Sequence, residues 1–333
     1  MLLAGLTACA TARVAVGPWQ APLGRQDPLV GRVWDVRAAR FVTPDAMVRE
    51  LSAARFVLLG EKHDNPDHHQ IQAVVLRALL ATGRRPVVAF EMFTPDDAPA
   101  IARYLAAAPR DAAGLGAAVD WKQSGWPDWG LYQPIAQAAL DAGVPIVAAN
   151  LTPATARALA RGQRSALPAD LAERYALDQP PPTALQAALT TEIREAHCGH
   201  FPADRVDGMV LAQRARDSAL AESLLAGPDG GVLIAGTGHV RNDRGVPSYL
   251  RRQGAGRDDC HARPARGTGR ADAAGGLRGG VRRRAAVRLG VVHAPDGRRR
   301  SPCPLPPGSP TAARLMPEGQ RARSQPRQAR KLR

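Results

Sequence analysis

Aromatic residues and cysteines are scarce in this chain of 333 residues. Phe, Trp and Tyr together make up 4% of it, and none of them follows Tyr249. Of the four cysteines, Cys9 stands near the N-terminus, Cys260 and Cys303 lie beyond residue 252, and Cys198 stands alone between them. A single cysteine in the central part of the chain excludes a fold that depends on a set of disulfide bonds.

Acidic residues are sparse in the last quarter of the chain, and this accounts for the net charge of +15. Residues 253–333 hold 19 of the 45 basic residues and 5 of the 30 acidic ones. The remaining chain has 26 basic and 25 acidic residues, so it is nearly neutral. This balance excludes a globally basic nucleic-acid-binding domain, and we expect no nucleic-acid partner. The absence of long apolar runs excludes a multispan membrane protein.

The segment 253–333 has the composition of a disordered basic tail. Gly and Pro make up 21 of its 81 residues, and arginines cluster at 282–284 and 298–300. Such a segment buries too little apolar surface to offset the entropy lost on ordering. Three interpretations stay open: a basic arm for nucleic acid or anionic lipid, a solvated extension, and an out-of-frame translation of a GC-rich gene.

We favour the frameshift, because GC-rich codons encode Arg, Gly, Ala and Pro in any frame. One choice of codons for residues 287–295, read one base later, gives Tyr-Asp-Trp-Val-Trp-Phe-Thr-Pro. That is an aromatic, strand-like segment of the kind that the tail lacks. On this hypothesis the native protein ends in a further strand. Sequencing the gene across this region tests it, and an intact frame would disprove it.

The N-terminal segment Met1–Cys9 is short and apolar and ends in Leu-Thr-Ala-Cys. This ending resembles a bacterial lipobox, in which the cysteine sulfur receives a diacylglycerol. We interpret residues 1–29 as the remnant of a lipoprotein signal and a linker, with the true start upstream, because a basic start and a longer apolar core are missing. Ala10 after the cysteine favours the outer membrane of the bacterial cell envelope. The alternative is a floppy apolar terminus with an incidental cysteine.

Residues 30–252 alternate between short apolar runs and stretches with helical spacing. This pattern predicts an α/β fold with a mainly parallel sheet flanked by helices. Residues 152–230 are predicted as an inserted, mainly helical subdomain. Strands are expected at 55–60, 86–92, 144–149 and 231–236, a hairpin at 31–43, and helices at 44–54, 67–80, 96–107, 131–141 and 246–252.

Unusual polar residues follow the predicted strands. Glu61 and His63 follow the first strand, Glu91 ends the second, and His239 follows the fourth. Because the carboxyl ends of parallel strands share one edge, we expect these side chains to meet there. Both histidines belong to a Gly-x-x-His sequence, and together they could hold a divalent metal ion, with a glutamate as third ligand or general base. The alternative is a structural or solvated histidine.

Four further histidines are less distinctive. His68 and His69 fall in the first turn of a predicted helix, where a solvated position is favoured over membership of the site. His197 and His200 flank Cys198-Gly199 and are interpreted as a helix terminus that faces the cavity. Without a second pair of cysteines, this segment is a poor candidate for a structural zinc site.

Three tryptophans lie close together in a predicted loop, at positions 121, 126 and 129. They are interpreted either as a small aromatic core beneath the loop or as an apolar wall for a flat ligand. The chain has no nucleophile elbow, no P-loop and no dinucleotide-binding glycine pattern.

Several of these motifs, in this order, resemble the ChaN family of haem-binding, iron-regulated bacterial lipoproteins, in the Tiki/TraB-like superfamily. The resemblance covers roughly residues 30–252. It is carried by LLGEKHDNP at 58–66, FEMF at 90–93, WKQSGW at 121–126, PIVAAN at 145–150, HCG at 197–199, AQ at 212–213, RD at 216–217 and GTGH at 236–239.

The resemblance implies haem as cofactor, a lipid anchor, a homodimer with stacked haems, and a contribution to haem and iron uptake. Candidate haem-binding residues are His63, His239, His197 and Tyr132, with Tyr104 and His200 also open. Tiki relatives imply an alternative function, a metal-dependent hydrolase in which His63 and His239 hold the metal and Glu61 or Glu91 assists. Family members also end in an aromatic strand, which favours the frameshift hypothesis.

Overall fold

The computed structural model describes residues 18–22, 25–107, 111–254, 260–262 and 289–291. For 260–262 and 289–291 it describes the backbone alone. Cys9 with its expected lipid, and most of the predicted tail 253–333, lie outside the described residues.

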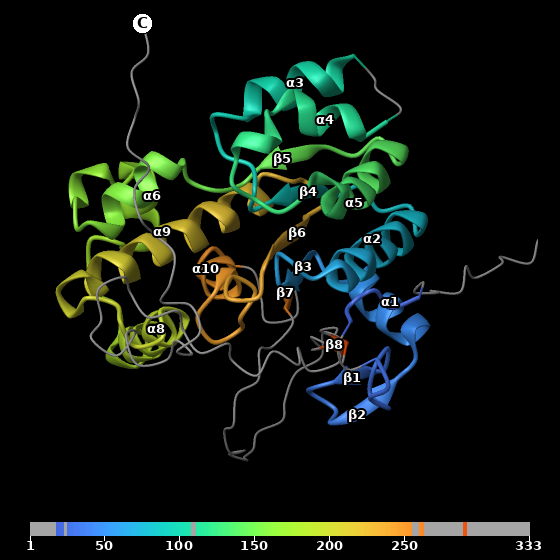
Figure 1. Cartoon of the computed structure of the whole chain (residues 1–333), viewed down its shortest axis with the longest axis horizontal. Helices are drawn as coiled ribbons and strands as arrows, with labels where there is room; N and C mark the ends of the chain where they lie inside the picture. Colours follow the sequence, from blue (N-terminus) through green and yellow to red (C-terminus); the bar gives the residue numbers. More distant parts are fainter. Residues whose placement is uncertain (1–17, 23–24, 108–110, 255–259, 263–288, 292–333) are drawn as a thin grey trace, which may run out of the picture. The chain divides into compact units, whose positions relative to one another are not determined.

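A parallel sheet of five strands forms the centre of the fold (Figure 1). All neighbouring pairs in it run parallel, which confirms the predicted α/β class. β6 pairs with both β3 and β4, although it comes last of the three in the chain. The strands, in spatial order, are β5 (Ile146–Ala148), β4 (Val87–Phe90), β6 (Gly231–Gly236), β3 (Phe56–Glu61) and β7 (Cys260–Ala262).

Two hydrophobic cores lie on opposite faces of this sheet, because alternate residues of a strand point to opposite sides. In β6, Val232 and Ile234 belong to one core and Leu233 and Ala235 to the other. All four are fully buried, so β6 is apolar on both faces, as expected of a central parallel strand.

The helices divide between these cores (Figure 1). The first core receives α1 (Pro44–Ala53), α2 (Pro66–Ala81), α3 (Ala98–Ala106), α4 (Ala113–Ala118) and α5 (Trp129–Asp141). The second receives α6 (Pro153–Ala160), α7 (Ala169–Tyr175), α9 (Val206–Leu225) and α10 (Val246–Arg252). The helix α8 (Thr183–Ala196) packs against α9 around a small cluster of its own. The predicted helical insertion between the third and fourth strands is confirmed.

One helix, α4, was not predicted, because its sequence AGLGAA has two glycines and little helical signal. Its packing explains the glycines. A side chain at Gly116 would come within 2.7 Å of the Trp129 ring, and one at Gly114 would come within 2.5 Å of Tyr104 Oη. Packing against these aromatic rings therefore stabilises α4, although the helix propensity of its residues is low.

The second sheet is antiparallel, with the order β2 (Arg40–Val42), β1 (Val33–Asp35), β8 (Leu289–Val291). The hairpin β1–β2 confirms the sequence prediction. β8 falls within residues 287–295, where the frameshift hypothesis expects an aromatic strand. Cys198 is disulfide-bonded, which the sequence analysis did not predict. Among the described helices, none is both long and apolar enough to span a bilayer.

Candidate functional site

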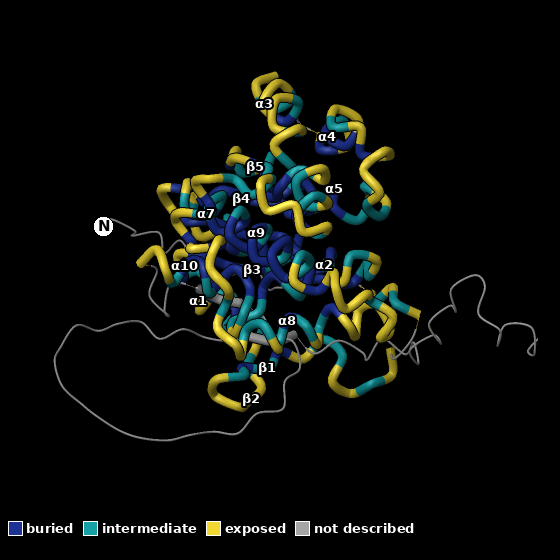
Figure 2. The backbone as a smooth tube through the Cα atoms, turned by 90° about the vertical axis from the view of Figure 1, so that its left-hand side faces the viewer, coloured by how far each residue is buried: buried dark blue, intermediate teal, exposed yellow. Residues whose placement is uncertain are grey.

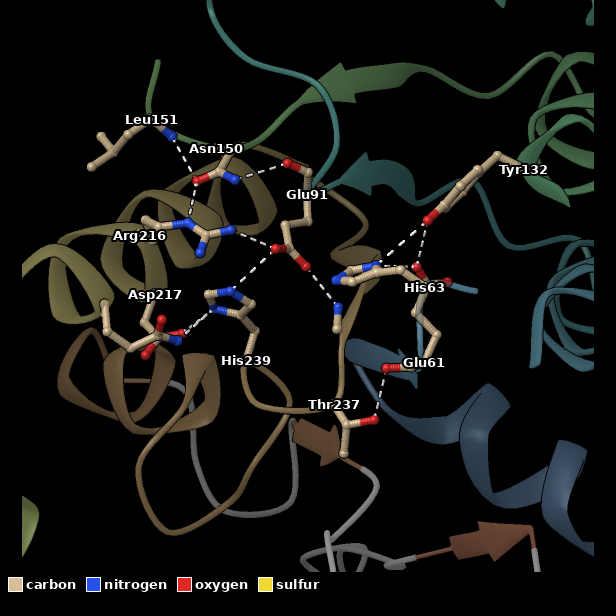
Figure 3. A network of polar contacts seen from close by, with 12 residues as sticks. Glu61, His63, Glu91, Tyr132, Asn150, Leu151, Arg216, Asp217, Thr237 and His239 are labelled. Atoms are coloured by element: carbon tan, nitrogen blue, oxygen red, sulfur yellow. Dashed lines mark hydrogen bonds and ion pairs between the residues drawn. The ribbon is translucent and has the colours of Figure 1, made fainter. Parts of the chain in front are cut away.

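The carboxyl ends of β3, β4 and β6 carry the polar residues that the sequence singles out, and the structure brings them together (Figure 3). Two glycines allow the close approach. A side chain at Gly60 would collide with Val240, at 2.4 Å, and one at Gly236 would stand 2.8 Å from His63 Nε2. Any larger residue at these two positions would push apart the strand ends that hold the site.

The buried carboxylate of Glu91 lies at the centre of the first group (Figure 3). Its Oε2 accepts a hydrogen bond from Gly236 N at 2.6 Å. Its Oε1 lies 2.5 Å from Arg216 Nη2 and 3.2 Å from His239 Nε2. Asn150 donates to the Glu91 carbonyl at 2.9 Å and accepts from Arg216 Nε at 3.2 Å. Glu91 thus joins β4, the end of β6 and α9.

The other ring nitrogen of His239 faces a second carboxylate. Its Nδ1 lies 2.7 Å from Asp217 Oδ1, and both side chains are buried. His239 therefore sits between Glu91 and Asp217, with one carboxylate on each nitrogen. A ring held in this way has both N–H groups satisfied and its orientation fixed.

Glu61 forms the second group, on the other side of Gly236. Its Oε1 accepts from Tyr132 Oη at 2.9 Å and lies 2.8 Å from His63 Nδ1. Its Oε2 lies 3.1 Å from His69 Nδ1. Tyr132 is fully buried, whereas the His63 side chain keeps 32% of its exposure. His63 is thus the member of this group that solvent reaches.

Burial and charge act against each other on these groups. Burial raises the pKa of Glu91, but His239 and Arg216 outweigh it and hold that pKa well below its usual range. For Glu61, hydrogen bonds from His63 and His69 similarly outweigh burial, so its pKa is lowered. Burial lowers the pKa of His239, but the charges of Glu91 and Asp217 raise it to about 9. His239 is therefore an imidazolium at neutral pH.

Asp217 responds in the opposite direction to Glu91. Burial raises its pKa to about 6, and the facing imidazolium of His239 offsets only part of this effect. At neutral pH Asp217 is therefore ionised, and His239 is flanked by two carboxylates. The charge of Arg216 completes the balance, so the site is close to neutral while holding several buried charges.

His69 is a correction to the sequence interpretation. The structure buries it, with Nε2 donating to the carbonyl of His63 at 3.0 Å, where a solvated helix end was favoured. A signal was present, because His69, Gln72 and Leu76 share one helical face and all three are buried. His68 is partly exposed, and its Nδ1 accepts from Lys62 N at 2.8 Å.

Comparison with known proteins shows which family has this fold. A family model described as "Haem-binding uptake, Tiki superfamily, ChaN" matches residues 47–250. The chain belongs to the ChaN family. A solved structure described as "Cofacial heme binding to ChaN of Campylobacter jejuni" is similar to it, with 21% sequence identity and a TM-score of 0.57. The similarity covers 67% of this chain and 86% of that one, and it shows a common fold. No curated protein matches this ChaN-family sequence.

The metal-dependent alternative receives no support from the contacts in this ChaN-family chain. Among the described residues, no group of three or more His, Cys, Asp or Glu side chains is arranged to hold a metal ion. Both nitrogens of His239 face carboxylates, and a protonated ring offers no lone pair to a metal.

The remaining candidate residues lie outside the strand-end groups. His197 and His200 are exposed on the connection between α8 and α9. His197 Nδ1 lies 2.7 Å from the carbonyl of Ile193, and its ring packs on Phe201 at 4.5 Å. Tyr104 donates to the carbonyl of Asp111, outside the polar groups at the strand ends.

The three tryptophans of the predicted loop differ in their surroundings: two belong to a small aromatic core and one lies beside the site. Trp121 is buried and packs against Trp129, at 4.8 Å between centroids, and against Tyr132 at 5.0 Å. These rings form the small aromatic core. Trp126 is only partly buried, and its ring meets the edge of His63 at 4.8 Å, so it reaches the rim of the site.

We predict that the stability of the protein falls as pH rises through about 9, because His239 then loses the proton that both carboxylates bind. The pKa of His239 is raised from an ordinary 6.5, so this contribution is fully present below pH 6.5 and disappears above 9. The loss should be on the order of 3 kcal/mol. Chemical denaturation at several pH values measures it. His239→Gln should flatten this dependence, and His200→Gln, at an exposed position, should retain it.

Proposed function

We propose that this protein binds haem, in the service of haem and iron uptake. The observation that carries the proposal is the family match over residues 47–250, whose description is haem-binding uptake. The similar solved structure gives further support, because its description names cofacial haem binding by ChaN. The next question is which side chain of this chain could bind the haem iron.

Three of the four predicted haem-binding residues are poorly suited to bind iron. Tyr132 is fully buried and donates to Glu61, and His239 is buried between two carboxylates. His63 is partly exposed, but a Cβ atom at Gly236 would stand only 2.8 Å from its Nε2, so the strand end of β6 limits access to this nitrogen from that side. We propose that these residues stiffen the strand ends, and that the iron binds elsewhere.

His197 has the features of an axial ligand. Its Nδ1 donates a hydrogen bond to the Ile193 carbonyl, so in the neutral ring the lone pair is on Nε2. Metal-binding histidines commonly donate their other ring nitrogen to a carbonyl or carboxylate in this way. The side chain is exposed, so a planar ligand can reach Nε2.

The surroundings of His197 suit a porphyrin better than a bare ion. Phe201 supplies an aromatic ring beside the imidazole. On the same helix Glu192 contacts the loop after β6, where its carboxylate lies 2.8 Å from Arg244 Nε. Arg194 lies exposed in the last turn of α8 and brings a cationic group that suits a propionate of haem, whereas the charge of Arg244 is met by Glu192 and Asp243. When bound, haem would supply its iron chemistry, while this chain supplies the ligand and the charge.

We predict that His197→Ala weakens haemin binding about tenfold or more and shifts the Soret band, because the axial nitrogen is lost. Absorbance titration of the purified full chain with haemin measures both. His200→Ala is the matched control, since His200 is an exposed histidine on the same connection, and it should titrate like the parent. A parent chain that gives no Soret change at micromolar haemin would overturn haem binding itself. Loss in His200→Ala or Tyr104→Phe alone would reassign the ligand.

We further propose that a lipid on Cys9 anchors the protein to the bacterial outer membrane. The support is the sequence Leu-Thr-Ala-Cys that ends at Cys9. The homodimer stays a prediction from the family resemblance.

We predict that the mature protein begins at an acylated Cys9 and stays in the membrane fraction after a wash at high salt. The wash matters because the basic segment 253–333 would also hold the protein to anionic lipid by charge alone, and salt screens that attraction. Mass spectrometry of the N-terminal peptide detects the lipid. Cys9→Ser should release the protein into the soluble fraction. An unmodified Cys9 in the parent would contradict the anchor without touching haem binding.

A further inference from the structure

Two large apolar side chains are exposed in the described part of the chain, Leu29 at 41% and Phe41 at 40%. They are twelve residues apart in sequence, but Arg32 links them. Its backbone N–H donates to the Leu29 carbonyl at 3.0 Å, and its guanidinium lies 4.5 Å from the centroid of the Phe41 ring. The two apolar side chains therefore belong to one small surface.

This surface also carries positive charge. Arg32, Arg37 and Arg40 are all exposed on or next to the hairpin β1–β2, and the Arg32 guanidinium lies over the Phe41 ring. The one acidic residue of the hairpin, Asp35, is buried, where it accepts hydrogen bonds from the backbone at residues 37 and 38. We call Leu29, Arg32, Arg37, Arg40 and Phe41 the hairpin face. Figure 2 shows the turn of this hairpin as exposed.

The N-terminal chain enters the described structure beside this face. The Trp19 ring packs against Gly31, where an added Cβ would stand 2.9 Å from it. The carboxylate of Asp67, at the start of α2, accepts from Gln20 N at 2.6 Å and from Ala21 N at 3.0 Å. Residues 19–21 are thereby fixed to the body, and Gly31 lies between Leu29 and Arg32.

The distance from Cys9 to the hairpin face is limited by this attachment. Eight residues lie between Cys9 and Pro18, and the nine steps from one to the other span at most about 3.5 Å each in a fully extended chain, or about 30 Å in all. A lipid on Cys9 would therefore hold the hairpin face within reach of the membrane.

We propose that the hairpin face docks on the anionic lipid surface to which Cys9 is anchored, with Leu29 and Phe41 entering the interface and the arginines contacting the headgroups. The proposal rests on the lipid anchor proposed above. An apolar pair beside exposed arginines has the chemistry of an interfacial contact. The apolar side chains gain from burial in the membrane interface, and the arginines are attracted to anionic headgroups. Docking would orient the body, which a lipid at a single point cannot do.

A second copy of this chain is the competing occupant. β2 is the outer strand of its sheet, and an outer strand that carries an exposed phenylalanine can pair with another chain. The charge of the face argues against this partner, because two copies would bring their arginines together. The experiment below separates the two occupants.

The test measures partition of the unacylated full chain, Cys9→Ser, onto lipid vesicles by sedimentation. Vesicles of phosphatidylcholine with phosphatidylglycerol are compared with phosphatidylcholine alone, at low and high salt. Binding by the basic segment 253–333 multiplies the partition of every variant equally, so the ratio to the parent isolates the hairpin face. Leu29→Ser/Phe41→Ser should lower partition about tenfold on the mixed vesicles, because the buried apolar area is lost.

A charge variant tests the arginines separately. It remains informative even if the protein with Leu29→Ser/Phe41→Ser fails to fold. Arg37→Gln/Arg40→Gln should lower partition several-fold on the mixed vesicles and leave it unchanged on phosphatidylcholine. Arg157→Gln/Arg161→Gln is the matched control at the end of α6, and it should behave as the parent does.

Three outcomes decide the proposal. Hairpin variants that partition like the α6 control overturn it. Hairpin variants that keep their partition but lose a dimer in analytical ultracentrifugation overturn it in favour of a second copy. Selective loss on anionic vesicles supports it. A haemin titration of the same variants should match the parent, so a failure of haem binding is distinguishable from a failure of docking.

Discussion

The buried carboxylate of Glu91 is the contact on which the architecture of the strand ends depends. It joins the end of β4 to the backbone at Gly236, and through Arg216 and His239 to α9 and the loop after β6. A buried charge with one partner removed costs about 3–5 kcal/mol, so each of these groups needs the others in place. Elements that are 145 residues apart in sequence are thus tied at a single atom group.

The histidines of the chain have different roles: some stabilise the strand ends, and one can bind a ligand. His239 and His69 have both ring nitrogens on carboxylates or carbonyls, and His63 has its Nδ1 on Glu61, so all three stabilise the strand ends. His197 has one nitrogen on a carbonyl, and its side chain is exposed. A histidine with both nitrogens engaged, such as His239, holds the fold, whereas an exposed one such as His197 can bind a ligand.

The sequence allowed the α/β class, the hairpin, four strands and most helices to be predicted, because each depends on a local pattern. The meeting of Glu61, His63, Glu91 and His239 was also predictable, since strand ends share one edge. The order of the strands was not, because no local signal places β6 between β3 and β4. The burial of His69 could have been predicted from the helical face it shares with Gln72 and Leu76, but its contact with Glu61, from another element, could not. Helix α4 was missed for the same reason, since distant rings stabilise it.

The late position of β6 in the chain has a consequence for biosynthesis. β3 and β4 do not pair with each other, and each waits for residues 231–236 before it gains this neighbour in the sheet. Contacts of such long sequence separation form slowly, because a large loop must close first. A nascent chain therefore carries apolar strands without their central partner until most of it has been made. For an exported lipoprotein, as proposed above, this delay keeps the chain unfolded while it is exported across the membrane.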